Sequence, residues 1–283
     1  MRSQAAASVL LLASSLPSVL GWGALGHETV AYIASNFVTA ATQSQFQSIL
    51  GDTSADYLAS VATYADSYRY TSAGSYSKPY HFIDANDNPP TSCSVDYNRD
   101  CGAGGCVVRA INNYLEFCEC AQAAKMLVHF IGDIHQPLHD ENLEVGGNDV
   151  PVTFGGTSTN LHAWDTSIPQ QYAGTATLAH AKKWAATLTT AIQSGAYQSS
   201  ASSWLTGINI NDPITSSMLW ATDANSYVCS TVMPNGYTAT ENVDLSGDYY
   251  NEAIPIVQIQ IAKAGYRLAA WLNLIATGTT GGL

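Results

Sequence analysis

Residues 129–139 read His-Phe-Ile-Gly-Asp-Ile-His-Gln-Pro-Leu-His, and this stretch decides both the fold and the site. It continues an apolar segment that predicts a helix over residues 121–134, which must end near Gln136 because the residue before a proline avoids helical conformation. His129 and Asp133 are four residues apart, so they share one face of that helix. An unpaired aspartate buried among apolar side chains is costly, which favours a cation as its partner.

A second informative stretch, Trp22-Gly-Ala-Leu-Gly-His27, follows a segment with the features of a secretory signal. Residues 1–21 contain Arg2, an apolar run and a small-residue cleavage site, as such signals do. Cleavage would make Trp22 the first residue, and its α-amine and carbonyl oxygen could then bind a metal together with His27. Imidazoles and carboxylates without cysteine form the ligand set expected of catalytic zinc.

The remaining chain, residues 22–283, is long enough for one large core and has no linker-like stretch, so we expect a single domain. No segment offers about 20 uninterrupted apolar residues, and we expect no membrane span. Ten Lys and Arg stand against 22 Asp and Glu, a formal net charge of −12 that becomes −13 without Arg2. This charge excludes a protein that tracks many phosphates with a basic surface. Metal ions rather than basic side chains must therefore hold any phosphate in the substrate.

The hydrophobic pattern is mostly helical. Strands are possible only around Pro151–Phe154, and residues 84–106 are expected to form a long surface loop that disulfides would need to pin. The expected helices cover Thr42–Leu50 (ended by Gly51), a segment from Ser54 to Ala65, residues 107–117, residues 121–134, a stripe from Leu178 to Ile192 (ended by Gly195), and a last helix that has Pro255 in its first turn and ends at Gly278.

Six cysteines are present, and a secreted protein can oxidise them to disulfides. Cys101 and Cys106 flank a glycine-rich segment that a local bridge could close. Six cysteines allow 15 pairings, so the spacing alone leaves the connectivity open. Cys118 and Cys120 are poorly placed to bridge each other, because i,i+2 geometry does not suit a disulfide.

Further histidines are candidate ligands. His81 lies in an apolar setting, His139 follows the proline turn, and His162 precedes Asp165 by three residues. Each of these alone could be an ordinary core or surface histidine. Together with the residues named above they are hard to explain by packing, whereas His135 lies off the ligand face and is expected to be structural.

The chain resembles the zinc-dependent S1/P1 nuclease family of fungi and plants over essentially the whole of residues 22–283. The resemblance implies an all-α, phospholipase-C-like multi-helix single domain with a trinuclear zinc cleft. The motifs that carry it are Trp22-Gly-x-x-Gly-His27-Glu28, Ala65-Asp66, His81-Phe82-Ile83-Asp84, His129-x-x-x-Asp133-x-x-Gln136-Pro137-Leu138-His139, Gly146-Gly147-Asn148, and Asn160-Leu161-His162 with Trp164-Asp165.

The resemblance also implies three zinc ions and two disulfides. One departure concerns His162 and Asp165, which are three residues apart rather than the usual four; on an α-helix this rotates the carboxylate by about 100°. The implied zinc ligands are Asp66, His81, His129 and Asp133 for the first ion, Trp22, His27 and the bridging Asp133 for the second, and His139, His162 and Asp165 for the third. The implied disulfides are Cys93–Cys229 and Cys101–Cys106, which leaves Cys118 and Cys120 without a role.

The activity implied by the resemblance is hydrolysis of single-stranded DNA and RNA to 5′-phosphorylated products, with removal of 3′-phosphates from 3′-nucleotides. Asp84 would orient the attacking water, and Arg69 would contact the phosphate. Phe82 would stack on a base, and Asn148 would bond near the base or phosphate. The implied protein is secreted, with no membrane and no obligate protein partner evident. Two alternatives remain: a phospholipase C on the same scaffold, and a non-catalytic zinc-binding relative.

Overall fold

The computed structural model describes residues 21–116 and 120–283, most of which are helical, and this confirms the expected all-α class. The α-helices are α1 (Ala24–Phe37), α2 (Ala40–Leu50), α3 (Tyr64–Tyr68), α4 (Tyr97–Asp100), α5 (Val107–Leu115), α6 (Ala121–Asp133), α7 (Ser167–Ala173), α8 (Leu178–Ser194), α9 (Pro213–Tyr227), α10 (Tyr237–Thr240) and α11 (Asp248–Thr277). The shorter helical turns are η1 (Ala59–Val61), η2 (Ser75–His81), η3 (Pro137–Asp140), η4 (Leu161–Trp164), η5 (Ala201–Leu205) and η6 (Val228–Val232).

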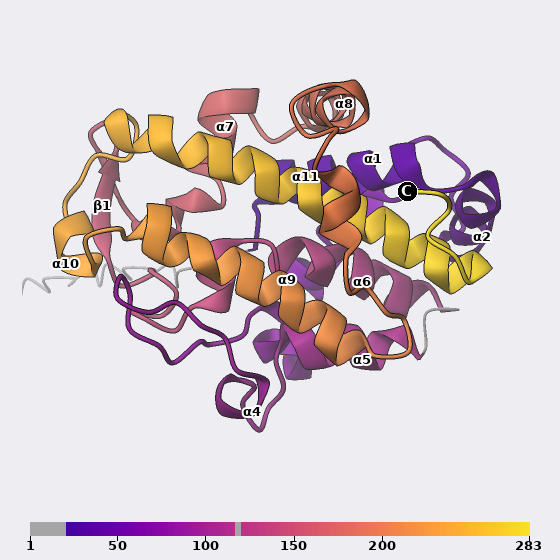
Figure 1. The fold of residues 1–283 in the computed structure, drawn as a ribbon, viewed down its shortest axis with the longest axis horizontal. Coiled ribbons are helices and arrows are strands. Elements are labelled where there is room, and N and C mark those ends of the chain that lie inside the picture. Colours follow the sequence, from indigo (N-terminus) through magenta and orange to yellow (C-terminus); the bar gives the residue numbers. More distant parts are fainter. Residues whose placement is uncertain (1–20, 117–119) are drawn as a thin grey trace, which may run out of the picture.

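The long helix α11 organises the core. It crosses the length of the molecule in Figure 1 and packs against α1, α2, α6 and α7. Helix α1 is held between α11 and α8. Gly265 allows α1 to approach closely, because a Cβ at this position would lie 2.5 Å from the Cβ of Ile33 and 3.0 Å from the carbonyl oxygen of Val30. The start of α1, where His27 lies, is thereby fixed against the centre of the molecule.

Helix α11 begins earlier than the sequence predicts. It starts at Asp248, so Pro255 lies inside the helix and not in its first turn. Tyr249, in the added turns, accepts a hydrogen bond from Trp164 Nε1 at 2.7 Å and donates one to the carbonyl oxygen of Val232 at 2.9 Å. These tertiary contacts stabilise the helical turns that precede the proline.

The predicted helix from Ser54 to Ala65 is wrong, because this segment is divided into turns, η1 and then the start of α3. The hydroxyl of Ser60 donates to the carbonyl oxygen of Tyr57 at 3.2 Å, a local bond of the kind that competes with helical pairing. The break leaves the carbonyl oxygen of Ala62 free to face His129, whose Nδ1 lies 2.7 Å away. The irregular segment therefore supports a candidate ligand.

The segment 84–106 is mainly irregular, as expected, apart from the short helix α4, which Asp96 caps by accepting from the Arg99 amide at 2.9 Å. Two disulfides pin this segment, Cys93–Cys229 and Cys101–Cys106, which is the pairing that the resemblance implies. Cys120 carries an exposed free thiol, and Cys118 lies outside the described residues. Within the described residues, no helix is both long and apolar enough to cross a membrane.

The two strands β1 (Pro151–Phe154) and β2 (Thr157–Asn160) form an antiparallel hairpin. Its turn consists of Gly155 and Gly156, both with positive φ, as a tight two-residue hairpin turn requires. The carboxylate of Asp244 accepts from the amides of these glycines at 3.1 and 3.0 Å. Because β2 runs directly into η4, the hairpin sets the position of His162.

Candidate metal centre and adjoining cavity

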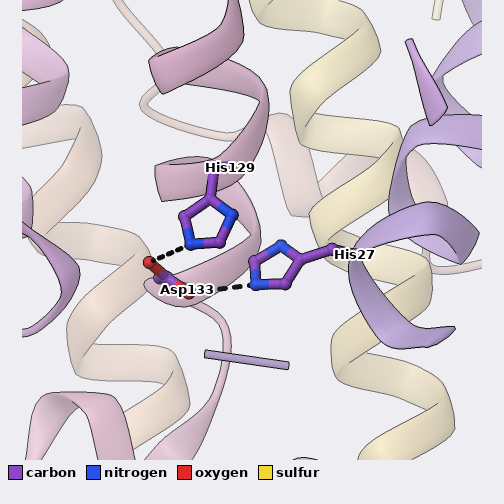
Figure 2. A group of neighbouring side chains, drawn as sticks. All are labelled: His27, His129 and Asp133. Carbon is purple, nitrogen blue, oxygen red and sulfur yellow. Dashed lines mark ion pairs between the residues drawn. The ribbon is translucent and has the colours of Figure 1, made fainter. Parts of the chain in front are cut away.

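Asp133, at the end of α6, lies at the centre of a buried cluster. Its Oδ2 lies 2.9 Å from His81 Nδ1 and 3.1 Å from His129 Nε2. Its Oδ1 lies 3.2 Å from Nε2 of His27, which enters from α1 (Figure 2). Asp66, on α3, is 3.6 Å from His129 Nε2 and 3.8 Å from His81 Nδ1. The two oxygens of Asp133 therefore face two overlapping groups of possible metal ligands: His27, His129 and Asp133, and Asp66, His81 and His129.

A third group combines His139, His162 and Asp165. His162 Nε2 lies 3.2 Å from His139 Nε2 and 2.8 Å from Asp165 Oδ2. His162 is part of the 3₁₀ turn η4, and Asp165 follows that turn directly. A 3₁₀ helix has three residues per turn, so positions i and i+3 lie on the same side. The three-residue spacing, which would rotate the carboxylate away on an α-helix, therefore keeps Asp165 beside His162.

Backbone carbonyl groups fix the orientation of three of these imidazoles. A carbonyl oxygen can only accept, so the Nδ1 facing it must carry the proton, and Nε2 is left to bind a metal. The three bonds are each 2.7 Å long: His129 to Ala62, His139 to His81, and His162 to Gly146.

The resulting arrangement suits cations. With Nδ1 protonated, the Nε2 lone pairs of His139 and His162 point toward each other, which a proton or a metal ion must compensate. Several buried polar atoms in the cluster have no hydrogen-bond partner: both ring nitrogens of His27, Oδ1 of Asp66, Oδ1 of Asp133 and Oδ2 of Asp165. Neutral imidazole nitrogens and carboxylate oxygens without thiolates match the preferences of catalytic zinc. The three groups are therefore equipped to hold metal ions.

Burial and charge set the protonation of the cluster. Burial lowers the pKa of His27 and brings that of His81 to about 4, which favours the neutral form that a metal ligand needs. Burial also acts on His129, but the charges of Asp133 and Asp66 outweigh it and raise its pKa to about 9. The pKa of Asp133 lies well below its ordinary value, because the nearby histidines outweigh the effect of its burial.

The chain next to Trp22 lies against the same cluster. Trp22 is fully buried. A methyl group placed on Gly21 would overlap the carboxylate of Asp133 and lie 2.8 Å from His27 Nε2. The backbone nitrogen of Trp22 is the junction at which cleavage is expected, and the residue before it lies against both His27 and Asp133.

Arg69 and Asp84 lie in different parts of the site, Arg69 beside Asp66 and Asp84 at an open cavity. Arg69 is buried, with Nη2 3.6 Å from Asp66 Oδ1, and its Nε and Nη2 make no hydrogen bond. Asp84 reaches an open cavity, and burial of its carboxyl group raises its pKa.

The open cavity has a volume of about 150 Å³ and adjoins the third ligand group. Asn148, which the sequence suggests as a substrate contact, is not part of its lining. Its amide donates to the carbonyl oxygen of Val145 at 2.8 Å and lies 3.5 Å from His162 Nδ1, so it supports the loop around His162. The lining consists of Phe82, Asp84, Leu138, His139, Glu141, Asn142, Val145, Gly146 and His162.

The sequence pattern assigns no role to Gln136 or Val145, and it predicts that His135 lies off the ligand face. Gln136 donates to the carboxylate of Asp165 and accepts from the Leu138 amide at 2.5 Å, which its place in the proline turn allows. Val145 is 58% exposed at the cavity with φ of 56°, an unusual value for a β-branched residue, and the following glycines are the one hint of it in the sequence. His135 donates to the Ile131 carbonyl at 2.7 Å, off the ligand face.

Comparison of the sequence with known proteins identifies the family of this chain. The S1/P1 nuclease family model matches residues 22–277. Nuclease S1 of Aspergillus oryzae is 57% identical over 265 residues, which cover 91% of this chain and 92% of the relative. Nuclease P1 of Penicillium citrinum is 52% identical over 90% of this chain and 97% of its own length, and Endonuclease 4 of Arabidopsis thaliana is 30% identical over 95% and 94%. The chain belongs to the S1/P1 nuclease family.

Proposed function

We propose that this chain is a secreted, zinc-dependent endonuclease that hydrolyses single-stranded DNA and RNA to 5′-phosphorylated products and removes 3′-phosphates from 3′-nucleotides. One observation carries the proposal: the chain brings together three groups of candidate metal ligands, and the third of them adjoins a cavity that Phe82 also lines. The names of the relatives, Nuclease S1 and Nuclease P1, support the same reaction class.

Three zinc ions fit the donor set. When bound, they would supply Lewis-acid stabilisation of charge on phosphoryl and leaving oxygens and would activate water. This role suits a chain with a formal charge of −12, which has few basic side chains for phosphates. The proposed ligands are Asp66, His81, His129 and Asp133 for one ion, Trp22, His27 and Asp133 for its neighbour, and His139, His162 and Asp165 for the third.

The remaining residues bind and orient the substrate. Arg69 has two nitrogens without a hydrogen bond, and its guanidinium donates to a phosphate oxygen in the proposed complex. Asp84 accepts a hydrogen bond from the attacking water and orients it toward phosphorus. Phe82 provides a face for one base, and bases in a duplex are already stacked on each other, so the site favours unpaired strands.

Removal of residues 1–21 completes the proposed site. Cleavage removes Gly21 from its place beside His27 and Asp133 and leaves a free α-amine on Trp22. An amine nitrogen has a lone pair for a metal, whereas an amide nitrogen has none. The two disulfides agree with secretion, since oxidising compartments allow such bonds.

The decisive experiment measures zinc content by mass spectrometry beside turnover of denatured DNA, a 3′-nucleotide and a phospholipid. We expect three zinc ions per chain, turnover of the first two substrates, and loss of both activities when a chelator removes the metal. Preferred turnover of the phospholipid would replace the nuclease by a phospholipase C. Full zinc content without any turnover would instead identify a non-catalytic relative.

A further inference from the structure

A second cavity lies between the end of α7 and the first turns of α8, helices that lie near each other at one edge of Figure 1. Its volume is about 300 Å³, within the range of small-molecule pockets. It shares no residue with the cavity beside the metal centre. The lining consists of Tyr172, Ala173, His180, Lys183, Trp184 and Thr187.

Two residues of the lining are aromatic and pack against each other. Tyr172 packs against Trp184 with ring centroids 5.6 Å apart and an interplanar angle of 50°. The indole is buried, with 3% of its surface exposed, whereas Tyr172 is 43% exposed. The supported ring of Tyr172 therefore presents an open surface on which a planar group can stack.

His180 is held in place before any ligand arrives. Its Nδ1 lies 2.8 Å from the carbonyl oxygen of Thr175 and must donate to it, which leaves Nε2 for another partner. The ring also packs directly on Gly174, where φ is 100° and an added Cβ would lie 3.0 Å from the imidazole. The glycine thus permits a close contact that fixes the ring.

The charge of the cavity is opposite to that of the protein. Lys183 is exposed and has no carboxylate within ion-pair distance among the described residues, whereas its neighbour Lys182 pairs with Asp56 at 3.4 Å. His180 and Lys183 lie three residues apart on one face of α8. The lining contains no acidic residue, although the chain has 22 acidic and 10 basic residues.

We propose that this cavity binds a nucleotide, with the base stacked on Tyr172, the phosphate held by Lys183 Nζ, and a hydroxyl group of the sugar donating to His180 Nε2. Stacking on an aromatic ring accepts any base, an ammonium group suits a phosphate, and an imidazole nitrogen with a free lone pair suits a sugar hydroxyl. An uncharged sugar would make no use of Lys183, and inorganic phosphate would make no use of Tyr172. The nucleotide is either free or part of a single strand; the second source rests on the proposed nuclease function.

Photolabelling with 8-azidoadenosine 5′-monophosphate tests the site without relying on activity. We expect the label on peptides that contain Tyr172 or Trp184, with AMP a better competitor than adenosine, inorganic phosphate or maltose. Lys183→Glu should reduce this labelling about fivefold, in line with loss of one exposed charge contact. Lys182→Glu is the matched control and should keep it, and labelling of the Phe82 cavity provides an internal reference in every sample.

Three results would overturn the proposal: no label at Tyr172 or Trp184, equal labelling in Lys183→Glu, or competition by maltose as strong as that by AMP. The source of the nucleotide follows from the KM values of Lys183→Glu. If a strand occupies the cavity, Lys183→Glu weakens binding of a 20-residue oligonucleotide but not of a dinucleotide. The ratio of the two KM values is then about fivefold higher in the variant than in the parent protein. If that ratio stays constant while labelling falls, the ligand is the free nucleotide.

Discussion

The paired ligand groups around Asp133 and the third group around His162 are built in different ways. His129 and Asp133 lie one turn apart on a regular α-helix, are fully buried and meet side chains from α1, α3 and η2. His139 and His162 come from short 3₁₀ turns next to a hairpin and an open cavity. The paired groups therefore depend on packing of the core, whereas the third depends on local loop geometry, and substitutions should separate the two.

Asp133→Asn should have the largest effect. It removes the one negative charge that faces both paired groups, so two cations would repel each other at short range. We expect turnover of denatured DNA to fall about 1,000-fold, equivalent to about 4 kcal/mol of transition-state stabilisation, with metal lost from the paired groups but kept at His139, His162 and Asp165. Zinc analysis and steady-state kinetics measure both.

The control for this variant is Asp223→Asn. Asp223 is also a carboxylate in ion pairs, with Lys263 at 2.8 Å and Arg267 at 3.1 Å, but it lies outside the ligand groups. The Asp223→Asn variant should have a lower free energy of unfolding and keep its full zinc content. Two retained zinc ions in Asp133→Asn at near-normal turnover would show that Asp133 is not a bridge.

One extra residue before Trp22 should affect only the paired groups. It turns the α-amine into an amide and keeps a residue beside His27 and Asp133, where Gly21 lies. We expect loss of one zinc ion and a decrease in turnover of about 100-fold. The same preparation cut back to Trp22 by a protease is the control, and an extended protein with full zinc and full activity would contradict the role of the amine.

Phe82→Ala should weaken binding of a base in the cavity and leave the metal content of all three ligand groups unchanged. Stacking contributes about 1–3 kcal/mol per base, so we expect turnover of single strands and 3′-nucleotides to fall about 30-fold. An abasic dinucleotide should be hydrolysed equally by both proteins. Unchanged turnover of 3′-nucleotides, or cleavage of duplex as fast as single strands in the parent protein, would rule out a stacking role for Phe82.

Gln136→Ala should weaken the third group alone and by the smallest amount. The amide orients Asp165 from outside the ligand set, and such partners change metal affinity by about 10-fold or more. Competition with a chelator measures the loss. Asn225→Ala is the matched control, because this buried amide donates to the carbonyl oxygen of Asp140 at 2.8 Å without contacting a ligand. An equal loss of zinc in both variants would show a general effect of packing.

The parts of the molecule that the sequence predicts well are those governed by simple periodicity. His129 and Asp133 share a helix face in any regular helix, and Gly51 ends α2 in the left-handed conformation that glycine readily adopts. The inward position of Asp66 depends instead on a helix break near Ala62. The exposed position of Val145 depends on a backbone conformation that its side chain disfavours, so neither follows from spacing.

Tertiary contacts explain most of the remaining differences. Tyr249 supports helical turns ahead of Pro255, although proline normally marks the beginning of a helix. The spacing of His162 and Asp165 could not be interpreted without knowing the type of helix. A spacing of three residues still places Asp165 beside His162, because the local turn is a 3₁₀ helix with three residues per turn.

The tight turn of the hairpin affects how stable this region is at acidic pH. Hydrogen bonds from Ser246, Gly155 and Gly156 hold the pKa of Asp244 well below its ordinary value. A carboxylate whose pKa is depressed in the folded protein contributes stability above its ordinary pKa of 3.8, and this contribution is lost only as the pH falls toward the depressed value. The Asp244 carboxylate therefore stays charged at a pH that would protonate ordinary carboxylates. Its hydrogen bonds to the Gly155–Gly156 turn persist there, and they hold the strand that leads to His162 in an acidic medium.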